Sequence, residues 1–486
     1  MYGELPKYVQ RMGFSPRFVP SPLKWPDISG LRVLVLVMPL PQRPLARPEC
    51  EAVWKHVRLG GSLLVVGDHT GGSGFARGMN ELLAPTGMRL NSDASWPRAA
   101  HWWGQLDLAP HGAAAGGGRL ASADGTGVNV GGTISTRWPA TPVLVGKAGW
   151  ADEGDPTNAA EGCLGNSVRE EGERVGDLVL CSATRFGLGK VMLFGDSSSF
   201  QNSALSNSYG FVCDVLYWLS SRRVHSAWRG NALIAILLVA AAWWSMRRTA
   251  ATPLWVCAVG VSICVAQAAC LAGRAPVTPP PARGGPPIAL IDTSHLNMLS
   301  GATVQGDAYW GLLHCLMRDG FLPLMARTFD AEELAQGAVL VVPAPLATFS
   351  PDDVRRCLDW VRKGGRLVLT VGHEQVGAAL PLLRRLGVSV DPTPMGRTEA
   401  SWGREEVQFY EAWPVRADQP GARVLLSDGD TPLALERRVG KGTALVIGDS
   451  FFLLDKNLEG LDKWYLGNIH FLRSWLQRPD EGGGKT

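Results

Sequence analysis

The sequence predicts an α/β protein of two open parallel-sheet domains joined by a two-helix transmembrane hairpin. Apolar strand-like runs alternate with helix-like segments, as in a layered α/β sheet, and this pattern occurs twice. Two further apolar runs lie near residue 250 and lack internal charges. A chain of 486 residues can form two or three domains with separate cores. The expected divisions are a first α/β domain (1–227), the hairpin (228–275), a Pro-rich linker (276–287) and a second α/β domain (288–486).

The two domains share a strand, a helix and a second strand in the same order. Continuous Val and Leu runs favour parallel strands that are covered on both faces. Each helix opens near a proline and carboxylates and stops at a Gly-Gly pair, which suits a left-handed helix end. The matching segments are 33–39 with 339–343, 48–61 with 351–365, and 62–69 with 366–373.

The ends of the two domains also match. Each has Gly-Lys, a strand, Gly-Asp-Ser and a final helix with a Trp-Leu pair, over 189–219 and 440–476. Residues 100–188, rich in glycine, and the shorter 395–440 are predicted as antiparallel extensions with loops. The second domain opens with a strand at 288–292 that has no counterpart in the first. Either the start at Met1 is internal to a longer gene, or the first sheet is completed otherwise.

The hairpin prediction rests on runs at 232–246 and 251–273. The second run is long enough to cross about 30 Å of hydrocarbon, and tryptophans lie at the ends of both. The alternative is a pair of buried core helices. A hairpin places both domains on one side of a bacterial inner membrane. Arg247 and Arg248 in its turn favour the periplasmic side, whereas Arg222, Arg223 and Arg229 oppose that orientation.

Composition excludes several classes of protein. A formal net charge of +3 gives no support to nucleic-acid binding, which needs a basic face. The nine cysteines form no CxxC pair and no Cys/His ligand spacing, so neither a structural zinc site nor a disulfide framework is expected. No signal peptide is visible at the start. The sequence predicts no metal and no cofactor.

The strand–Pro–helix–Gly-Gly–strand pattern, followed by Gly-Lys–strand–Gly-Asp-Ser, resembles the class I glutamine-amidotransferase-like domains. The resemblance covers both soluble parts, and the closest subgroup is that of accessory proteins of gliding-motility-type ABC transport systems. It implies flavodoxin-like sheets. True amidotransferases carry a cysteine nucleophile at a strand-to-helix elbow, where this chain has Gly67-Asp68-His69 and Gly372-His373-Glu374. The resemblance therefore implies the noncatalytic branch of the superfamily.

Several polar residues follow predicted strands and are expected at the carboxyl edges of the sheets, where open α/β folds bind ligands. No HxH or HExxH spacing accompanies them, so the alternative is a solvated cluster of strand-end residues. The ligand-binding candidates are Asp68, His69, Asp196, Asp292, His295, His373, Glu374 and Asp449.

The two Gly-Asp-Ser turns offer a second chemistry. Ser197 or Ser450, with His470 as base, would form a serine hydrolase site, although no aspartate precedes His470 by three residues as the esterase pattern requires. The alternative is structural, with the aspartate or serine capping the following helix.

These observations predict a noncatalytic membrane-anchored binding or scaffolding component, accessory to an ABC-type transporter or an envelope assembly. Its expected partners are the lipid bilayer and other membrane or transporter subunits. The two domains are expected to pair as an intramolecular pseudo-dimer. The alternative is an envelope-facing serine hydrolase that acts on an ester or glycan through a Gly-Asp-Ser turn.

Overall fold

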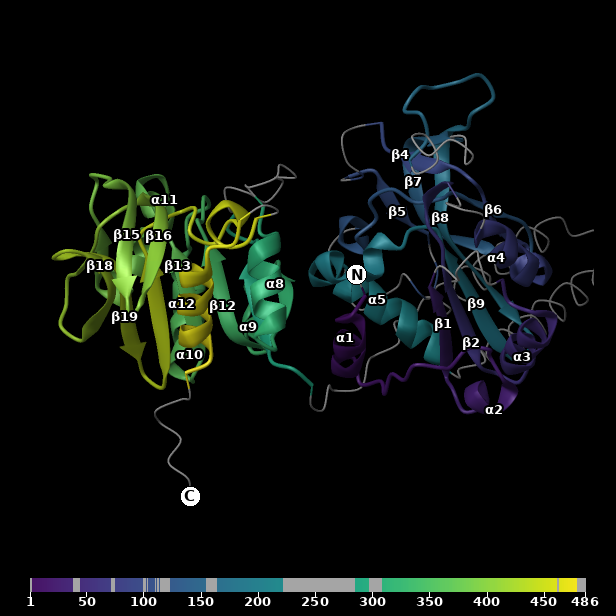
Figure 1. Cartoon of the computed structure of the whole chain (residues 1–486), viewed down its shortest axis with the longest axis horizontal. Helices are drawn as coiled ribbons and strands as arrows, with labels where there is room; N and C mark the ends of the chain where they lie inside the picture. Colours follow the sequence, from purple (N-terminus) through teal and green to yellow (C-terminus); the bar gives the residue numbers. More distant parts are fainter. Residues whose placement is uncertain are drawn as a thin grey trace, which may run out of the picture. The chain divides into compact units, whose positions relative to one another are not determined.

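The computed structural model describes residues 2–37, 44–70, 75–98, 102, 104–109, 111, 113, 123–153, 164–221, 285–296, 308–460 and 463–478. The chain divides into two compact units (Figure 1). The N-terminal unit comprises Met12–Ala204 and Ser208–Pro281. The C-terminal unit comprises Met1–Arg11, Leu205–Asn207 and Ala282–Thr486.

The main sheet of the N-terminal unit has the order β1-β2-β9-β8-β7-β4, with β5 also pairing with β7. The first three strands are parallel, and the strands beyond β9 are antiparallel. Every residue of β2 and β9 is buried, which explains their unbroken apolar runs. The strands are β1 (Val33–Val37), β2 (Ser62–Val66), β4 (Ala94–Trp96), β5 (Leu106–Leu108), β7 (Thr141–Asp152), β8 (Val175–Phe186) and β9 (Gly189–Phe194).

Helix α3 (Arg47–Arg58) shows how the local sequence sets the first and last residues of a helix. A proline at its start fits the first turn, and Glu49 accepts hydrogen bonds from the backbone N–H groups of Ala46 (2.9 Å) and Leu23 (2.7 Å). The helix ends before Gly60, which has a φ of 102°. The unit also contains α2 (Trp25–Ile28), α3 (Arg47–Arg58), α4 (Phe75–Leu83), α5 (Asn202–Ser220) and the pair β3 (Met88–Leu90) and β6 (Ile134–Thr136).

The main sheet of the C-terminal unit has the order β11-β10-β12-β13-β20-β19-β18. Its first five strands are parallel, and β19 and β18 extend it in antiparallel fashion. The strand order reverses between β10 and β12, so the crevice beside their carboxyl ends is a topological switch point. The strands are β10 (Ile288–Asp292), β11 (Leu322–Ala326), β12 (Gly337–Pro343), β13 (Arg366–Thr370), β18 (Ala422–Asp428), β19 (Thr431–Val439) and β20 (Gly442–Ile447).

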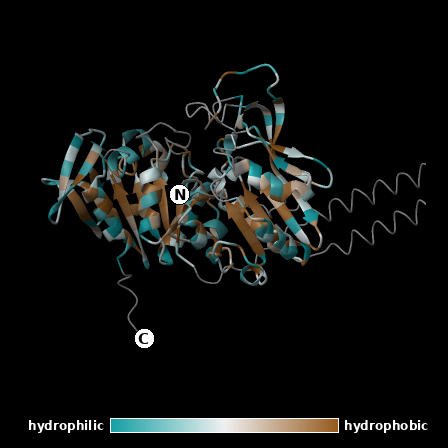
Figure 2. Ribbon diagram, turned by 45° about the vertical axis from the view of Figure 1, so that its right-hand side comes forward, coloured by the Kyte–Doolittle hydropathy of each residue, from teal (hydrophilic) through white to brown (hydrophobic). Residues whose placement is uncertain are grey.

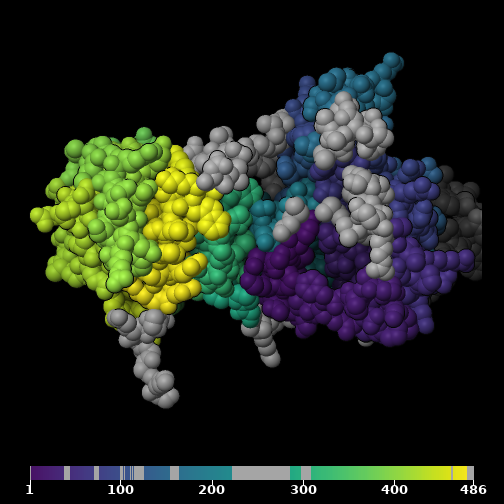
Figure 3. Space-filling model, in the orientation of Figure 1, coloured from purple at the N-terminus to yellow at the C-terminus, as the bar shows by residue number. Residues whose placement is uncertain are grey.

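Helices cover this sheet, and two small two-stranded sheets complete the unit. The central strands of both units are mainly apolar, whereas the helices have hydrophilic sides (Figure 2). In the space-filling view of Figure 3, the yellow atoms of the last part of the chain lie directly against the yellow-green atoms that precede them in the same unit. The remaining elements are α1 (Leu5–Arg11), α8 (Trp310–Arg318), α9 (Ala331–Leu334), α10 (Pro351–Arg362), α11 (His373–Leu386), α12 (Leu466–Leu476), β14 (Val388–Val390), β15 (Gly396–Trp402), β16 (Glu405–Ala412) and β17 (Val415–Ala417).

The predicted fold class needs correction. Among the residues that the structure describes, no helix is both long enough and apolar enough to cross a bilayer. The longest of those given above, α5, begins with a polar run of Asn and Ser residues. Residues 228–275, where the hairpin was predicted, lie outside the described residues. The structure supports a mixed α/β architecture with several sheets, in place of two parallel sheets joined by a transmembrane hairpin. The assignment as a membrane protein, which depended on that hairpin, is withdrawn with it.

Candidate functional site

The Gly-Asp-Ser turn of the N-terminal unit follows β9 and has a structural role. Asp196 is fully buried and accepts hydrogen bonds from the backbone N–H groups of Asn129 (2.6 Å) and Ser198 (2.7 Å). Burial, together with the negative charge of Asp68, raises the pKa of Asp196 to about 7. The carboxyl group therefore ties the end of β9 to the segment that leads into β6.

The second Gly-Asp-Ser turn, after β20, repeats this arrangement. Asp449 is fully buried and accepts hydrogen bonds from the backbone N–H groups of Tyr410 (2.7 Å), Phe451 (2.8 Å) and Glu411 (3.3 Å). Burial raises its pKa to about 7 against the opposing effect of these N–H groups. Asp449 therefore ties the end of β20 to β16.

The glycine of each turn is needed for close approach of the backbone. A Cβ atom at Gly195 would lie 2.0 Å from the carbonyl oxygen of Gly132. A Cβ atom at Gly448 would lie 1.9 Å from the carbonyl oxygen of Trp413. No side chain fits at either place. Glycine is therefore required where β9 and β20 end close to a neighbouring backbone segment.

The serine of each turn bonds to a side chain that follows the neighbouring parallel strand, in the loop after β2 or in the first turn of α11. The Ser197 hydroxyl donates to Asp68, and the Ser450 hydroxyl donates to the side-chain oxygen of Gln375. Ser197 is fully buried, and Ser450 is 5% exposed. Both hydroxyls are therefore used inside the fold.

The histidine proposed for a hydrolase does not meet either serine. The Nδ1 atom of His470, on α12, lies 2.7 Å from the Oε1 atom of Glu405 at the start of β16. In the N-terminal unit the Nδ1 atom of His69 lies 3.2 Å from the Thr70 hydroxyl, and its Nε2 atom lies 3.5 Å from Asp68. Within the described part of the chain, no imidazole nitrogen is hydrogen-bonded to the serine of either turn. The described residues thus lack the serine–histidine pair of the proposed hydrolase site.

The structure does bring two predicted residues together at the switch point of the C-terminal unit. The Nδ1 atom of His295 lies 2.7 Å from the Oδ2 atom of Asp292, at the end of β10. Its Nε2 atom lies 3.6 Å from Asp353, in the first turn of α10. The imidazole ring stacks on Phe349, with centroids 3.8 Å apart and planes 11° apart. His295 is therefore held between two carboxylates and an aromatic ring, and is 6% exposed.

Asp353 is the member of this cluster that sequence reasoning missed. It was interpreted only as a first-turn carboxylate, whereas it also closes a capping box with Ser350 and pairs with Arg356. Burial acts to raise its pKa, but hydrogen bonds from Ser350 and Arg356 and the charge of His295 lower it overall. The Ser-x-x-Asp spacing at 350–353 was the available signal, but it could not reveal the contact with His295.

His373 and Glu374 are the exposed members of the predicted set. Both lie in the first turn of α11, beside the carboxyl end of β13. The His373 ring lies nearly parallel to the Trp413 ring, with centroids 5.5 Å apart. Among the described residues, no three His, Cys, Asp or Glu side chains are arranged to hold a metal ion. At the carboxyl end of β13, His373 and Glu374 are therefore accessible to solvent, and the His373 ring lies against Trp413.

Comparisons with known proteins give a domain but no activity. A family described as "Domain of unknown function (DUF4350)" matches residues 316–472, less than half of the chain. No curated protein matches. The resemblance to amidotransferase-like domains finds no counterpart in these comparisons and stays a prediction.

Among solved structures, the mmIFT52 N-terminal domain is 15% identical, with a TM-score of 0.32, over 40% of this chain and 98% of that chain. An exo-β-1,4-mannosidase from an Opitutaceae bacterium is 15% identical, with a TM-score of 0.27, over 38% of this chain and 35% of that chain. A β-galactosidase from Bacillus circulans sp. alkalophilus is 15% identical, with a TM-score of 0.27, over 43% of this chain and 35% of that chain. At such identities and TM-scores these neighbours carry no argument about function.

Proposed function

We propose that the chain is a noncatalytic binding or scaffolding component, an accessory subunit of a transporter or envelope assembly. The observation that carries this proposal is the use of the strand-end polar groups inside the fold. Both turn serines and both turn aspartates are buried and hydrogen-bonded to neighbouring segments. The polar residues of both turns thus hold the structure together.

The cysteines support the same proposal. Glutamine hydrolysis needs an accessible thiolate, because the thiol form is a poor nucleophile. Burial raises the pKa of Cys315 to about 11 and that of Cys357 to about 12, and it also raises the pKa values of Cys50 and Cys181. These thiols are protonated at neutral pH, and none of them follows β2 or β13.

A fluorophosphonate probe separates this proposal from the serine hydrolase. We expect no labelling of the purified chain, because neither turn serine is hydrogen-bonded to a histidine of the described chain and both serines are buried. The Ser450→Ala variant should give the same blank lane as the unaltered chain, with an active serine esterase as the positive control. Labelling that disappears in Ser197→Ala or Ser450→Ala would contradict the noncatalytic proposal and favour the hydrolase.

Sizing of the native complex tests the scaffolding role directly. We expect the chain, crosslinked in its own cells and purified, to run as an assembly well above its own 52.2 kDa. The exposed pair His373 and Glu374 is the expected contact. The double variant His373→Ala/Glu374→Ala should therefore lose the assembly, whereas Arg404→Ala/Glu406→Ala, at another exposed place in the same unit, should retain it. A chain that runs alone before any substitution would overturn the proposal.

A further inference from the structure

Strand β1 is the outermost strand on one side of the N-terminal sheet (Figure 1). It pairs in parallel with β2, and within the described residues no strand pairs with its other edge. Its sequence is Val-Leu-Val-Leu-Val. It therefore contains no proline and no charged residue, and its register with β2 has no bulge, although such features commonly protect edge strands from further pairing.

The backbone groups on the outer edge of β1 can be identified from one hydrogen bond. The N–H group of Ser62 donates to the carbonyl of Arg32, directly before β1. Successive residues of a strand direct their N–H and C=O groups to opposite sides. The N–H and C=O groups of Val33, Val35 and Val37 therefore point away from β2. No described residue donates to or accepts from these groups.

The second copy of the repeat shows what lies at the corresponding edge. Strand β12 is the counterpart of β1, because each pairs in parallel with the strand that follows its Gly-Gly helix end, β13 or β2. The other edge of β12 is paired with β10, also in parallel. All residues of β10 are buried. A short aliphatic strand therefore occupies, in the C-terminal unit, the place that is open beside β1.

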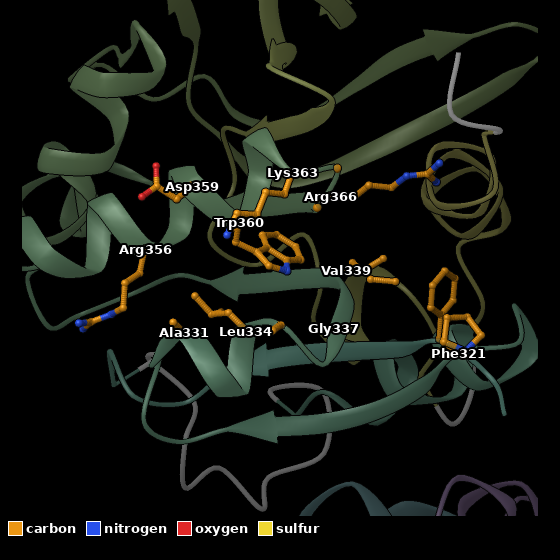
Figure 4. Close-up of a pocket in the computed structure, with 15 residues that line it drawn as sticks. Phe321, Ala331, Leu334, Gly337, Val339, Arg356, Asp359, Trp360, Lys363 and Arg366 are labelled. Carbon is orange, nitrogen blue, oxygen red and sulfur yellow. The ribbon is translucent and has the colours of Figure 1, made fainter. Parts of the chain in front are cut away.

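The exposure of the two strands differs accordingly. Val35 is 38% exposed, whereas Val341, which has the same place in the register of β12, is 1% exposed. Val339 is also 1% exposed, although it borders the cavity of about 720 Å³ shown in Figure 4. Strand β12 is thus buried even where a cavity adjoins it, while β1 keeps an exposed apolar side chain beside its open edge.

We propose that β1 binds an extended aliphatic segment of a partner protein, which joins the sheet as a parallel strand in the way that β10 pairs with β12. Addition of a strand to a sheet edge is a general mode of peptide recognition, in which main-chain hydrogen bonds give affinity and side chains give specificity. The sequence of β10, Ile-Ala-Leu-Ile-Asp, indicates the chemistry of the segment. This surface is independent of the scaffolding contact proposed above, since it involves neither His373 nor Glu374.

A second copy of this chain fits the open edge less well than a partner segment does. Two copies related by a two-fold axis meet through the same surface, so that their β1 strands would run antiparallel. The strands that pair with β1 and β12 are β2, β10 and β13, and all of them are parallel. Because parallel and antiparallel ladders differ in the spacing of their hydrogen bonds, the repeat favours a parallel segment from a different protein.

A fluorescent peptide with the sequence of residues 286–294 tests the edge in the full chain. We expect its anisotropy to rise to saturation as the chain is added, since the peptide contains the β10 sequence. No saturable binding up to millimolar concentration would overturn the proposal.

Two N-methylated forms of the peptide show which of its sides is bound. The carbonyl of Pro287 accepts from the N–H of Leu322 on β11, so by alternation Ile291 also faces β11 and Leu290 faces β12. N-methylation of Leu290 should weaken binding to β1 by about tenfold, because it removes a donor to the edge. N-methylation of Ile291, on the far side, should have little effect. Equal losses would mean pairing on both sides, as in the place of β10 itself, and would contradict the proposal.

Substitutions in the chain locate the binding. Val35→Lys should weaken the peptide by about tenfold or more, because a charge replaces an apolar contact on the edge strand. The matched control is Val175→Lys, at a 57% exposed valine of β8 in the same unit, and it should retain binding. Circular dichroism confirms the fold of both variants. Equal losses in the two variants would contradict the proposed location.

The size of the chain in solution, measured by sedimentation without peptide, separates a partner segment from a second copy. We expect Val35→Lys to leave the sedimentation of the purified chain unchanged. A dimer that dissociates in Val35→Lys but persists in Val175→Lys would show that a second copy occupies the edge, and would overturn the assignment to a partner protein.

Discussion

Asp449→Ala is expected to lower the free energy of unfolding of the C-terminal unit by roughly 3 to 5 kcal/mol. Three backbone N–H groups lose their acceptor at a fully buried position, and buried donors left without an acceptor cost free energy. Urea unfolding followed by circular dichroism gives the difference from the unaltered chain.

The control for this substitution is Asp430→Ala in the exposed turn between β18 and β19. Because no described hydrogen bond or ion pair involves the Asp430 side chain, a change within about 0.5 kcal/mol is expected. Similar losses in both variants would show that the Gly-Asp-Ser turn is not the structural tie proposed for it. The turn would then have to be considered again as a functional site.

Lys190→Ala is expected to destabilise the N-terminal unit by roughly 2 to 4 kcal/mol. The substitution removes the ammonium that serves the carbonyls of Trp218 and Ser221, and also the buried stem of the side chain. Lys190 is buried, and burial together with the charge of Arg185 lowers its pKa to about 8. Thermal and urea unfolding measure the loss.

The repeat supplies a matched control, since Lys441 stands at the same place in the second copy. Lys441→Ala should change stability by less than about 0.5 kcal/mol, because this lysine is exposed and forms no described ion pair. Equal effects of the two substitutions would show that Lys441 also contributes to stability through the carbonyl groups at the end of its own final helix.

Local signals predicted the elements that the sequence could determine alone. Unbroken Val and Leu runs mark β2, β12 and β13, which are buried on both faces. Gly60 and Gly364 end α3 and α10 with φ values of 102° and 120°, as a glycine after a helix often does. These features follow from residues within one turn or one strand, so a single sequence displays them.

The wrong prediction also came from a local signal. Two apolar runs near residue 250 suggested a hairpin, yet no helix of the described chain could cross a membrane, and the runs themselves lie outside it. Hydropathy reports how apolar a segment is, and it leaves open what covers that segment. The antiparallel strands β7, β8, β18 and β19 lie within 100–188 and 395–440, where the sequence predicted antiparallel extensions.

By itself the sequence determined the strand–helix–strand order, the repeat and the two Gly-Asp-Ser turns, because each of these is a pattern of residues that are close together in the chain or recur in the same order. Only the tertiary structure decided what those turns do. The acceptor role of Asp449 towards Tyr410 and the contact of His295 with Asp353 join residues 39 and 58 positions apart. Such sets form only when packing brings distant segments together, so spacing along the chain does not show them.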